Sequence, residues 1–361
     1  MPPYRVGFIG CGRIASTMED QSTVHPVSIA GAFAAQPDAQ IVAASNRGAA
    51  ALAAFGQRWG VTALYQDYRA MLAHERLDVV VVATHPPNHA ELVCAAAAAG
   101  ARGIFCEKPM ALSLAECDAM LAACRAGGAT LLVNCTRRWS GQYEAVRQMI
   151  VDETLGPLLH IVAHCQGCKP TPEWVAETEG PLLHDAVHTF DVLRFFAGEI
   201  ASIQGSATRR WRTELRVEDT SYALVQFASG VDAVVITDEL TQYHRWDVEL
   251  QCERGVIRLE WQPGLWHATA DAFEAGHWWS LTPGVLPPPA WQEQAIQVAA
   301  RDLLDSLAGG PAPRCSGEDG RAAVEAIMAV YESQRRDGAR VALPLGSGEP
   351  LLEILRREGR L

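Results

Sequence analysis

A glycine-rich stretch near the start of the sequence has the spacing of a pyrophosphate-binding turn. The stretch GFIGCGRIA, residues 7–15, lies at the end of the apolar run Tyr4–Ile9. Its second glycine allows a tight turn, its third allows the backbone to approach a pyrophosphate, and Ala15 is small enough for helix–strand packing. A helix that begins here would direct its N–H groups at the phosphates. The candidate cofactor-binding residues are Gly10, Cys11, Gly12, Arg13 and Ile14.

The end of the next apolar run, Gln40–Ala44, carries the residues that would select the cofactor. An NAD-binding chain normally has a carboxylate here for the ribose hydroxyls. This chain has Ser45, Asn46 and Arg47 instead. A guanidinium would hold a 2′-phosphate, helped by the serine or the asparagine. These residues favour NADP over NAD; the alternative is that Arg47 stacks on the adenine and both cofactors bind.

Hydride transfer from an alcohol needs a base for the hydroxyl proton and a cation beside the developing alkoxide. Lys108 follows the apolar run Gly103–Cys106 at a carboxyl end, where ligands bind in open parallel sheets. A predicted helix from about Leu183 to Phe196 supplies imidazoles, with residues 184, 188 and 191 on one face and residue 185 three positions before 188. The candidate catalytic residues are Lys108, His188, His184 and Asp185.

Two patterns are similar to metal sites, and we expect no metal at either. His184 and His188 have the spacing of a helical zinc pair, but the glutamate of the HExxH pattern is absent. Cys165 and Cys168 have CxxC spacing, but no second CxxC follows. We expect the ten cysteines to be reduced thiols.

The elements that must position these residues change character along the chain. In the first third, apolar runs alternate with Ala-rich helical segments, which is typical of a parallel sheet covered on both faces. These runs are Tyr4–Ile9, Gln40–Ala44, Val79–Ala83, Gly103–Cys106 and Thr130–Asn134. After about residue 139, runs with period-two alternation predict a largely antiparallel sheet. These are Leu158–Ala163, Ser202–Ala207, Thr220–Phe227, Val231–Thr237, Asp247–Cys252 and Val256–Trp261.

We therefore predict two domains. Residues 1–138 form an α/β Rossmann dinucleotide-binding domain, and residues 139–361 form a second domain with a largely antiparallel sheet and a helix inserted early. Residues 263–290, rich in Trp, Pro and Gly, are expected to form a covering loop. Gln21–His25 follows the glycine turn; His25 is either a substrate contact or part of a surface loop.

Composition excludes several classes of protein. The chain has 361 residues, of which 49% are hydrophobic and 20% charged, so it is not disordered. A net charge of −12 argues against a nucleic-acid partner, which would require a surplus of Lys and Arg. No apolar run approaches the ~18 residues of a membrane span, and the first residues lack an export signal. We expect a cytoplasmic protein without a membrane partner.

From residues 106–109, CEKP, the family becomes recognisable. The chain resembles the glucose–fructose oxidoreductase / inositol dehydrogenase / rhizopine-catabolism (Gfo/Idh/MocA) family over nearly its whole length. The matching stretches are GFIGCGRIA, VVVATHPPNHAEL, GIFCEKPMA, VNCTRRW and LLHDAVHTFDVLRFFAG. The resemblance implies a Rossmann domain over residues 1–138 followed by an α+β domain for substrate binding and oligomerisation over residues 139–361. The second domain would be built on a large open, mostly antiparallel sheet, which often forms the oligomer interface in the family, here of a homodimer or homotetramer.

The resemblance also implies roles for individual residues. Lys108 would relay a proton at the reacting carbon, and Glu107 would position it or contact the ribose. The peptide bond before Pro109 would be cis. His188 would be the general base in oxidation and the general acid in reduction. Further cofactor contacts would come from Thr84, His85, Pro86, Asn88, His89 and Arg137, and Trp139 would wall the site.

This chain departs from the family at one position of the site. Sugar and inositol dehydrogenases of the family usually have an aspartate four residues before the catalytic histidine, where this chain has His184. Either His184 replaces that carboxylate as a substrate contact, or Asp185 takes the orienting role. Compared with the usual family spacing, Gln21–His25 also belongs to an extra stretch of roughly ten residues between the glycine turn and the next helix.

The leading hypothesis is an NAD(P)-dependent dehydrogenase or reductase acting on a sugar, a polyol or a related carbonyl compound. A second is an enzyme with tightly bound cofactor that oxidises a sugar transiently and catalyses redox-neutral elimination or glycoside cleavage. A third, of another class, is a cofactor-binding regulator. Against the third, the chain keeps Lys108 and His188.

Overall fold

The computed structural model describes residues 2–167, 177–269 and 279–361. The chain divides into two compact units, and each is described by itself. The first comprises Met1–Ser140 and Gln292–Ala322, and the second comprises Gly141–Trp291 and Ala323–Leu361. The expected division at residues 138 and 139 treated each domain as one continuous stretch. The compact units differ from it because residues 292–322 return to the first unit.

The first unit is built on a six-stranded sheet in which all neighbouring strands are parallel, in the order β3-β2-β1-β4-β5-β6. The strands are β1 (Tyr4–Ile9), β2 (Ala39–Ser45), β3 (Ala63–Tyr65), β4 (Val79–Val82), β5 (Gly103–Cys106) and β6 (Thr130–Val133). Every residue of β4 and β5 is buried, as the apolar runs predicted. This strand order is that of the Rossmann fold, and its direction reverses between β1 and β4 at a topological switch point.

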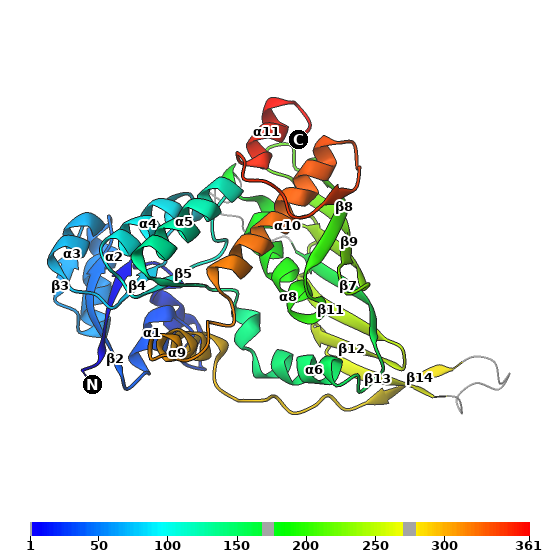
Figure 1. Cartoon of the computed structure of the whole chain (residues 1–361), viewed down its shortest axis with the longest axis horizontal. Helices are drawn as coiled ribbons and strands as arrows, with labels where there is room; N and C mark the ends of the chain where they lie inside the picture. Colours follow the sequence, from blue (N-terminus) through cyan, green and yellow to red (C-terminus); the bar gives the residue numbers. More distant parts are fainter. Residues whose placement is uncertain (1, 168–176, 270–278) are drawn as a thin grey trace. The chain divides into compact units, whose positions relative to one another are not determined.

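Helices cover both faces of this sheet (Figure 1), with α1 and α9 on one face and α4 and α5 on the other. The helices are η1 (Thr17–Gln21), α1 (Ile29–Ala34), α2 (Ala49–Trp59), α3 (Tyr68–His74), η2 (Pro86–Asn88), α4 (His89–Ala98), α5 (Leu114–Gly127), η3 (Thr136–Trp139) and α9 (Ala295–Leu307). The sequence analysis did not identify β3, α3 or α5.

Helix α9 comes from the late part of the chain and packs on the first sheet. A Cβ atom at Gly103 would lie 2.9 Å from Leu307, so the glycine allows the helix to approach β5 closely. Arg301 makes two hydrogen bonds to the Asp38 carboxylate, at 2.7 and 3.1 Å. Helix α9 therefore belongs to the first unit, although it follows strands of the second unit in the sequence.

The second unit contains a nine-stranded sheet in the order β14-β13-β12-β11-β7-β10-β9-β8-β15. Its strands are β7 (Leu158–Gln166), β8 (Ile200–Thr208), β9 (Thr220–Phe227), β10 (Asp232–Asp238), β11 (Arg245–Cys252), β12 (Gly255–Glu260), β13 (Gly264–Thr269), β14 (Ser280–Gly284) and β15 (Val341–Ala342). Among the described strands of this sheet, β7 and β10 are the one parallel pair. The prediction of a covering loop over residues 263–290 is wrong where β13 and β14 extend the sheet by a hairpin.

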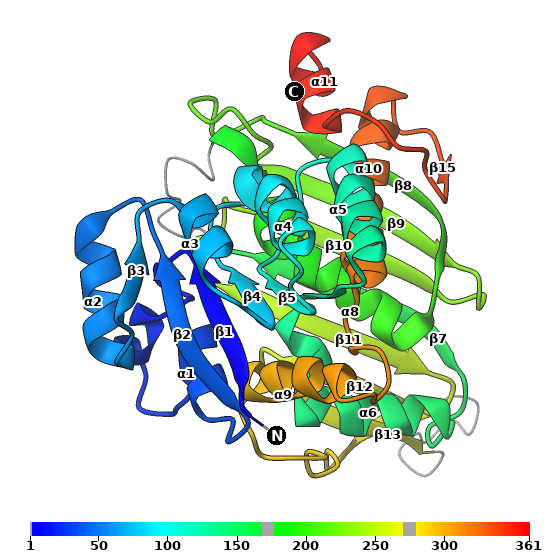
Figure 2. The same cartoon turned by 60° about the vertical axis from the view of Figure 1, so that its left-hand side comes forward.

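Helices of the second unit lie on one side of this sheet (Figures 1 and 2). They are α6 (Gly141–Val151), a π-helical turn η4 (Leu182–Ala186), α8 (Val187–Ala197), α10 (Gly317–Arg335), whose residues 317–322 belong to the first unit, and α11 (Leu351–Arg357). Helix α10 is fixed to β8, where Gly205 N–H donates to Ser333 Oγ at 2.9 Å. Residues of β9 and β10 alternate between buried and exposed positions, as the period-two pattern predicted.

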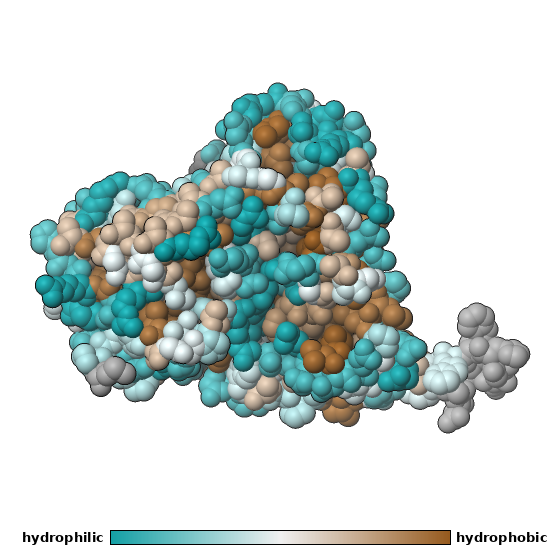
Figure 3. All heavy atoms as spheres, viewed as in Figure 1, coloured by the Kyte–Doolittle hydropathy of each residue, from teal (hydrophilic) through white to brown (hydrophobic). Residues whose placement is uncertain are grey.

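The surface seen in Figure 3 is mostly hydrophilic with smaller hydrophobic areas. Such a mixture is usual for a globular chain with this composition. Within the described ranges, no helix is both long and apolar enough to cross a bilayer.

Candidate active site

The glycine turn at the end of β1 leaves its backbone open. Gly10 has φ +100°, and a Cβ there would lie 2.4 Å from the carbonyl oxygen of Ala83. Its N–H donates to Ser45 O at 2.9 Å, which ties the ends of β1 and β2 together. A Cβ at Gly12 would meet no heavy atom within 4 Å. The turn therefore has open space beside Gly12, where the backbone can approach a pyrophosphate, and the fit with a dinucleotide is good.

The helix expected directly after this turn is interrupted. One turn forms, in which Ser16 N–H donates to Gly12 O at 3.0 Å, and the chain then leaves the helix. It returns at α1, where Ile29 N–H donates to Ile14 O at 3.0 Å. Residues 17–28 are therefore an insertion within a helix, which explains the extra stretch seen in the sequence.

The carboxylate of Glu19 organises this insertion. It accepts hydrogen bonds from the N–H groups of Val27 and Ser28, at 3.0 and 2.8 Å, and contacts His25 Nδ1 at 2.5 Å. The His25 side chain is half-exposed. Of the two alternatives for His25, the contact with Glu19 favours the surface loop.

A cavity of about 740 Å³ lies beside the glycine turn, within the first unit. Its lining includes Gly10, Gly12 and all three residues expected to select the cofactor. Ser45 is buried, and the Asn46 side chain accepts from Cys11 N–H at 3.2 Å and donates to Gly48 O at 3.0 Å. Arg47 is exposed. Of the three, only Arg47 therefore presents a charged side chain to the cavity.

Charged residues at the start of α3 also line this cavity, and the sequence analysis did not identify them. Asp67 caps α3, and Arg69 lies with its guanidinium 4.5 Å from the centre of the Tyr68 ring. The Glu91 carboxylate pairs with Arg69 and accepts from the Tyr68 hydroxyl at 2.5 Å. Burial, then the contact with Glu91, raises the pKa of Tyr68 to about 12. In the sequence, the local signal for these lining residues is Asp67, a residue type that favours the N-cap of a helix.

The loop after β4 supplies further lining residues. Thr84, His85 and Asn88 line the cavity, and Pro86 is buried at the start of η2. His89 differs from the expectation: it is completely buried, and its ring nitrogens face Pro109 O and Thr84 O at 3.0 and 3.1 Å. It therefore supports the loop from inside, because a side chain without exposed surface does not touch a ligand in the cavity.

Lys108 is half-buried at the carboxyl end of β5, and its peptide bond to Pro109 is cis, as the resemblance implied. Glu107 beside it is buried; its Oε1 accepts from Asn134 Nδ2 at 2.5 Å and its Oε2 accepts from Lys108 N–H at 3.3 Å. Burial raises the pKa of Glu107, against the lowering effects of Asn134 and the Lys108 charge. These contacts favour the positioning role for Glu107 over a ribose contact.

The residues of η3, which follow β6, differ in their burial. Arg137 is half-buried. Arg138 and Trp139 are buried and donate to Arg314 O at 3.0 Å and to Asp302 Oδ2 at 2.8 Å. The Trp139 indole has no exposed surface, which does not support the expectation that it walls the site.

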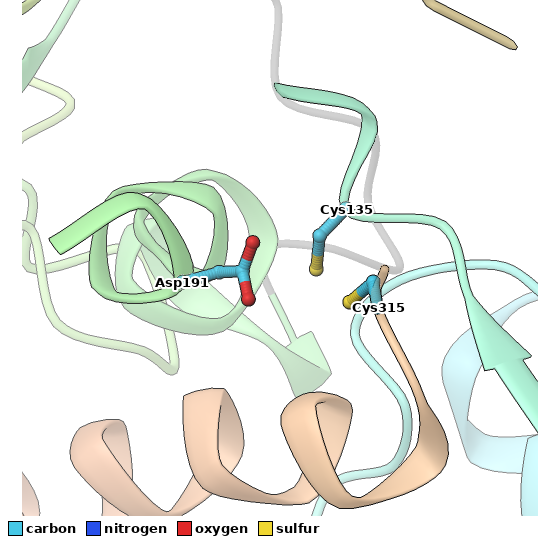
Figure 4. A group of neighbouring side chains, drawn as sticks. All are labelled: Cys135, Asp191 and Cys315. Carbon is cyan, nitrogen blue, oxygen red and sulfur yellow. The ribbon is translucent and has the colours of Figure 1, made fainter. Parts of the chain in front are cut away.

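Two thiols lie next to this segment. Cys135 and Cys315 are buried, and their Sγ atoms lie within 4.8 Å of each other (Figure 4). Val133 N–H donates to Cys315 O at 3.1 Å, which adds residues 314–316 to the edge of β6. Neither cysteine forms a disulfide bond. Cys168, predicted to be a thiol near Cys165, lies outside the described residues.

In the second unit, the predicted helix over 183–196 begins with the π-helical turn η4 rather than as α-helix. A π turn closes i→i+5 hydrogen bonds, so it contains more residues per turn, and positions 184 and 188 no longer share a face by simple i, i+4 spacing. His184 Nδ1 contacts Glu179 Oε2 at 3.0 Å. Asp185 lines a small cavity with Asp238 and Glu239. His184 and Asp185 thus have separate surroundings.

His188 is half-buried in the first turn of α8. Asp191 on the same helix, whose side chain is drawn in Figure 4, is fully buried. The buried residue Glu218 contacts the start of η4, and the sequence analysis did not identify it. Its Oε1 accepts from Leu182 N–H at 3.0 Å, and its Oε2 lies 3.1 Å from the Tyr331 hydroxyl. Glu218 fixes the start of the turn that carries His184.

Comparisons with known proteins agree with this architecture. Residues 4–135 match a family described as an oxidoreductase family with an NAD-binding Rossmann fold, and residues 143–258 match the GFO/IDH/MocA C-terminal domain. The chain is 32% identical over 314 residues to D-apiose dehydrogenase of Paraburkholderia graminis, covering 82% of this chain and 81% of that one. It is 27% identical to inositol 2-dehydrogenase of Pseudomonas fluorescens, covering 78% and 82%.

The fold is also that of a solved relative. The WlbA dehydrogenase of Bordetella pertussis, in complex with NADH and UDP-GlcNAcA, superposes with a TM-score of 0.77 at 23% identity, covering 95% of this chain and all of that one. The glycine turn, the Rossmann strand order and the Lys108 position lead to the same conclusion as these matches: the chain belongs to the GFO/IDH/MocA family of NAD(P)-dependent oxidoreductases.

Proposed function

We propose that this oxidoreductase transfers a hydride between a nicotinamide cofactor and a secondary hydroxyl of a sugar or polyol. The observation that carries the proposal is the position of Lys108 at the carboxyl end of β5, in the sheet that carries the glycine turn. Its backbone N–H donates to the buried Glu107 carboxylate. The names of the relatives, D-apiose dehydrogenase and inositol 2-dehydrogenase, support a polyhydroxylated substrate.

Each candidate residue has a proposed task. When bound, the nicotinamide cofactor accepts or donates the hydride. Lys108 Nζ, a cation, stabilises negative charge that develops on the substrate oxygen. His188 takes the hydroxyl proton in oxidation and returns it in reduction. His184 contacts the substrate. The place of Asp185 in the small cavity with Asp238 and Glu239 supports His184 over Asp185 for this task.

The Gly10–Ile14 turn, Thr84, His85, Asn88 and Arg137 are proposed to hold the cofactor, with Pro86 and His89 shaping the loop. For the choice of cofactor we propose NADP, because Arg47 makes no ion pair within the described ranges and is exposed in the cavity lining. The carboxylates of Asp67 and Glu91 in the same lining oppose a 2′-phosphate, and NAD is the alternative. The ratio of kcat/KM for the two cofactors, measured for the wild type and for Arg47→Ala, distinguishes them.

We further propose that the open sheet face of the second unit joins copies of the chain into a homodimer or homotetramer. Tyr222 and Leu224 of β9 and Val234 of β10 are exposed on this sheet, with 56%, 54% and 39% of their surface accessible. Exposed apolar side chains that cluster on a sheet mark an interaction surface. Light scattering coupled to size exclusion measures the assembly.

The test of the main proposal is the absorbance of reduced nicotinamide in the presence of NAD or NADP and a panel of sugars and polyols, including D-apiose and inositols. Turnover that is lost in Lys108→Ala and His188→Ala supports the dehydrogenase. Turnover of a sugar without added cofactor, with nicotinamide bound to the purified protein, would instead support redox-neutral chemistry. Cofactor binding without turnover of any compound in the panel would contradict the proposal.

A further inference from the structure

A buried carboxylate upstream of η4 has no role in the chemistry described so far. Glu179 has no exposed surface, and its Oε2 lies 3.0 Å from Nδ1 of His184. Its other oxygen, Oε1, has no hydrogen-bond partner within the described ranges. Burying a carboxylate with one oxygen unsatisfied costs free energy, so such a group in a folded protein calls for an explanation.

The backbone around Glu179 is clamped on both sides. Two residues before it, Glu177 O accepts a hydrogen bond from Arg356 Nη2 at 2.5 Å, and the same guanidinium donates to Arg216 O. One residue after it, Gly180 has φ +66°, and a Cβ there would lie 2.5 Å from the Glu218 carboxylate oxygens. Because the backbone is fixed on both sides of Glu179, this side chain loses little further conformational entropy when it orients a neighbouring residue.

The contact with His184 has a defined chemical consequence. A carboxylate only accepts hydrogen bonds, so the imidazole must donate from Nδ1. The proton of the neutral ring is then placed on Nδ1, and Nε2 is the atom that can accept or donate a substrate proton. About a quarter of the His184 side chain is exposed, 26%, whereas Glu179 is not exposed at all.

We propose that Glu179 is a positioning residue of the active site, which fixes the ring orientation and the tautomer of His184. The inference rests on the proposed function, because it takes His184 as a substrate contact. Glu179 itself touches neither substrate nor cofactor, since it is fully buried.

Steady-state kinetics of the full chain test the proposal. Glu179→Gln keeps the shape but removes the charge, and we expect kcat/KM for the sugar or polyol to fall by about tenfold to a hundredfold, the range for a lost charged hydrogen bond. The KM for the cofactor should not change. Glu179→Asp, which keeps the carboxylate, should restore part of the loss. The matched control is Glu177→Gln, an exposed glutamate two residues away, which should behave as the wild type.

A double-mutant cycle and a spectroscopic measurement separate positioning from a general structural effect. If Glu179 acts through His184, the Glu179→Gln/His184→Gln double variant should lose no more activity than His184→Gln alone. In the wild type, ¹⁵N NMR of labelled histidines, assigned with His184→Gln, should show His184 with its proton on Nδ1. A proton on Nε2 with Nδ1 bare would overturn the proposal, as would wild-type kinetics in Glu179→Gln.

The outcomes distinguish this inference from the proposed function. If the wild type turns over no compound in the panel, the dehydrogenase proposal fails, and the NMR measurement still reports whether the dyad exists. If the wild type is active but the ring tautomer is the opposite one, only the role of Glu179 fails. Should Glu179→Gln not fold, the tautomer in the wild type decides.

Discussion

Glu218 makes the free energy of unfolding depend on pH. It is fully buried, and burial is the largest influence on its pKa, which rises from an ordinary 4.5 to about 7 despite the hydrogen bonds from Leu182 N–H and the Tyr331 hydroxyl. The folded chain therefore keeps a proton on Glu218 that the unfolded chain releases above about pH 4.5. As the pH rises, this proton must be removed from a buried site, at a cost in folding free energy.

The magnitude follows from the shift. A difference of about 2.5 between the two pKa values corresponds to about 3 kcal/mol. For this raised carboxyl pKa, the penalty is absent below pH 4.5, grows between pH 4.5 and 7, and is constant above pH 7. Glu218→Gln does not ionise and resembles the protonated acid, so it can accept from Leu182 N–H and donate to Tyr331. The variant should match the wild type near pH 4 and exceed its stability by up to about 3 kcal/mol at pH 8.

Urea denaturation followed by circular dichroism at pH 4.5, 6 and 8 measures this difference. The control is Glu214→Gln, which removes an exposed carboxyl whose pKa is lowered, so it should give no gain in stability as the pH rises. A Glu218→Gln variant that is equally stable to the wild type at all pH values would refute the reasoning. So would a gain that shrinks toward high pH.

Three further predictions concern other parts of the chain. Gly10→Ala should weaken cofactor binding at least tenfold in a fluorescence titration, because the positive φ and the 2.4 Å approach to Ala83 O displace the turn; unchanged affinity would contradict the geometry. Glu107→Gln should lower kcat by about tenfold, since the amide oxygen still accepts from Asn134 but the amide NH2 no longer accepts from Lys108 N–H or holds charge beside Lys108; equal kcat would argue against the positioning role. Leu224→Lys should dissociate the proposed assembly in light scattering and leave the monomer folded, because residue 224 is exposed on the sheet; an unchanged mass would exclude this face as the interface.

The sequence by itself determined the features that depend on neighbouring residues. The apolar runs predicted β1, β5 and β9 with the bounds that the structure has, because a strand buried on both faces, or one with strict alternation, is recognisable locally. The glycine turn was likewise readable, since the need for a positive φ and for open space is met by glycine alone. The position of Lys108 at a strand end followed from the same runs.

Only the tertiary structure decided which polar groups serve the site. The turn at residues 182–186 begins where Glu218, 36 residues later, accepts the Leu182 N–H, and no local pattern encodes that partner. The sequence predicts His89 as a cofactor contact, but its side chain is buried, and its ring nitrogens face two backbone carbonyls. Burial and hydrogen-bond partners arise from chain segments that are distant in sequence, and spacing along one segment contains no information about them.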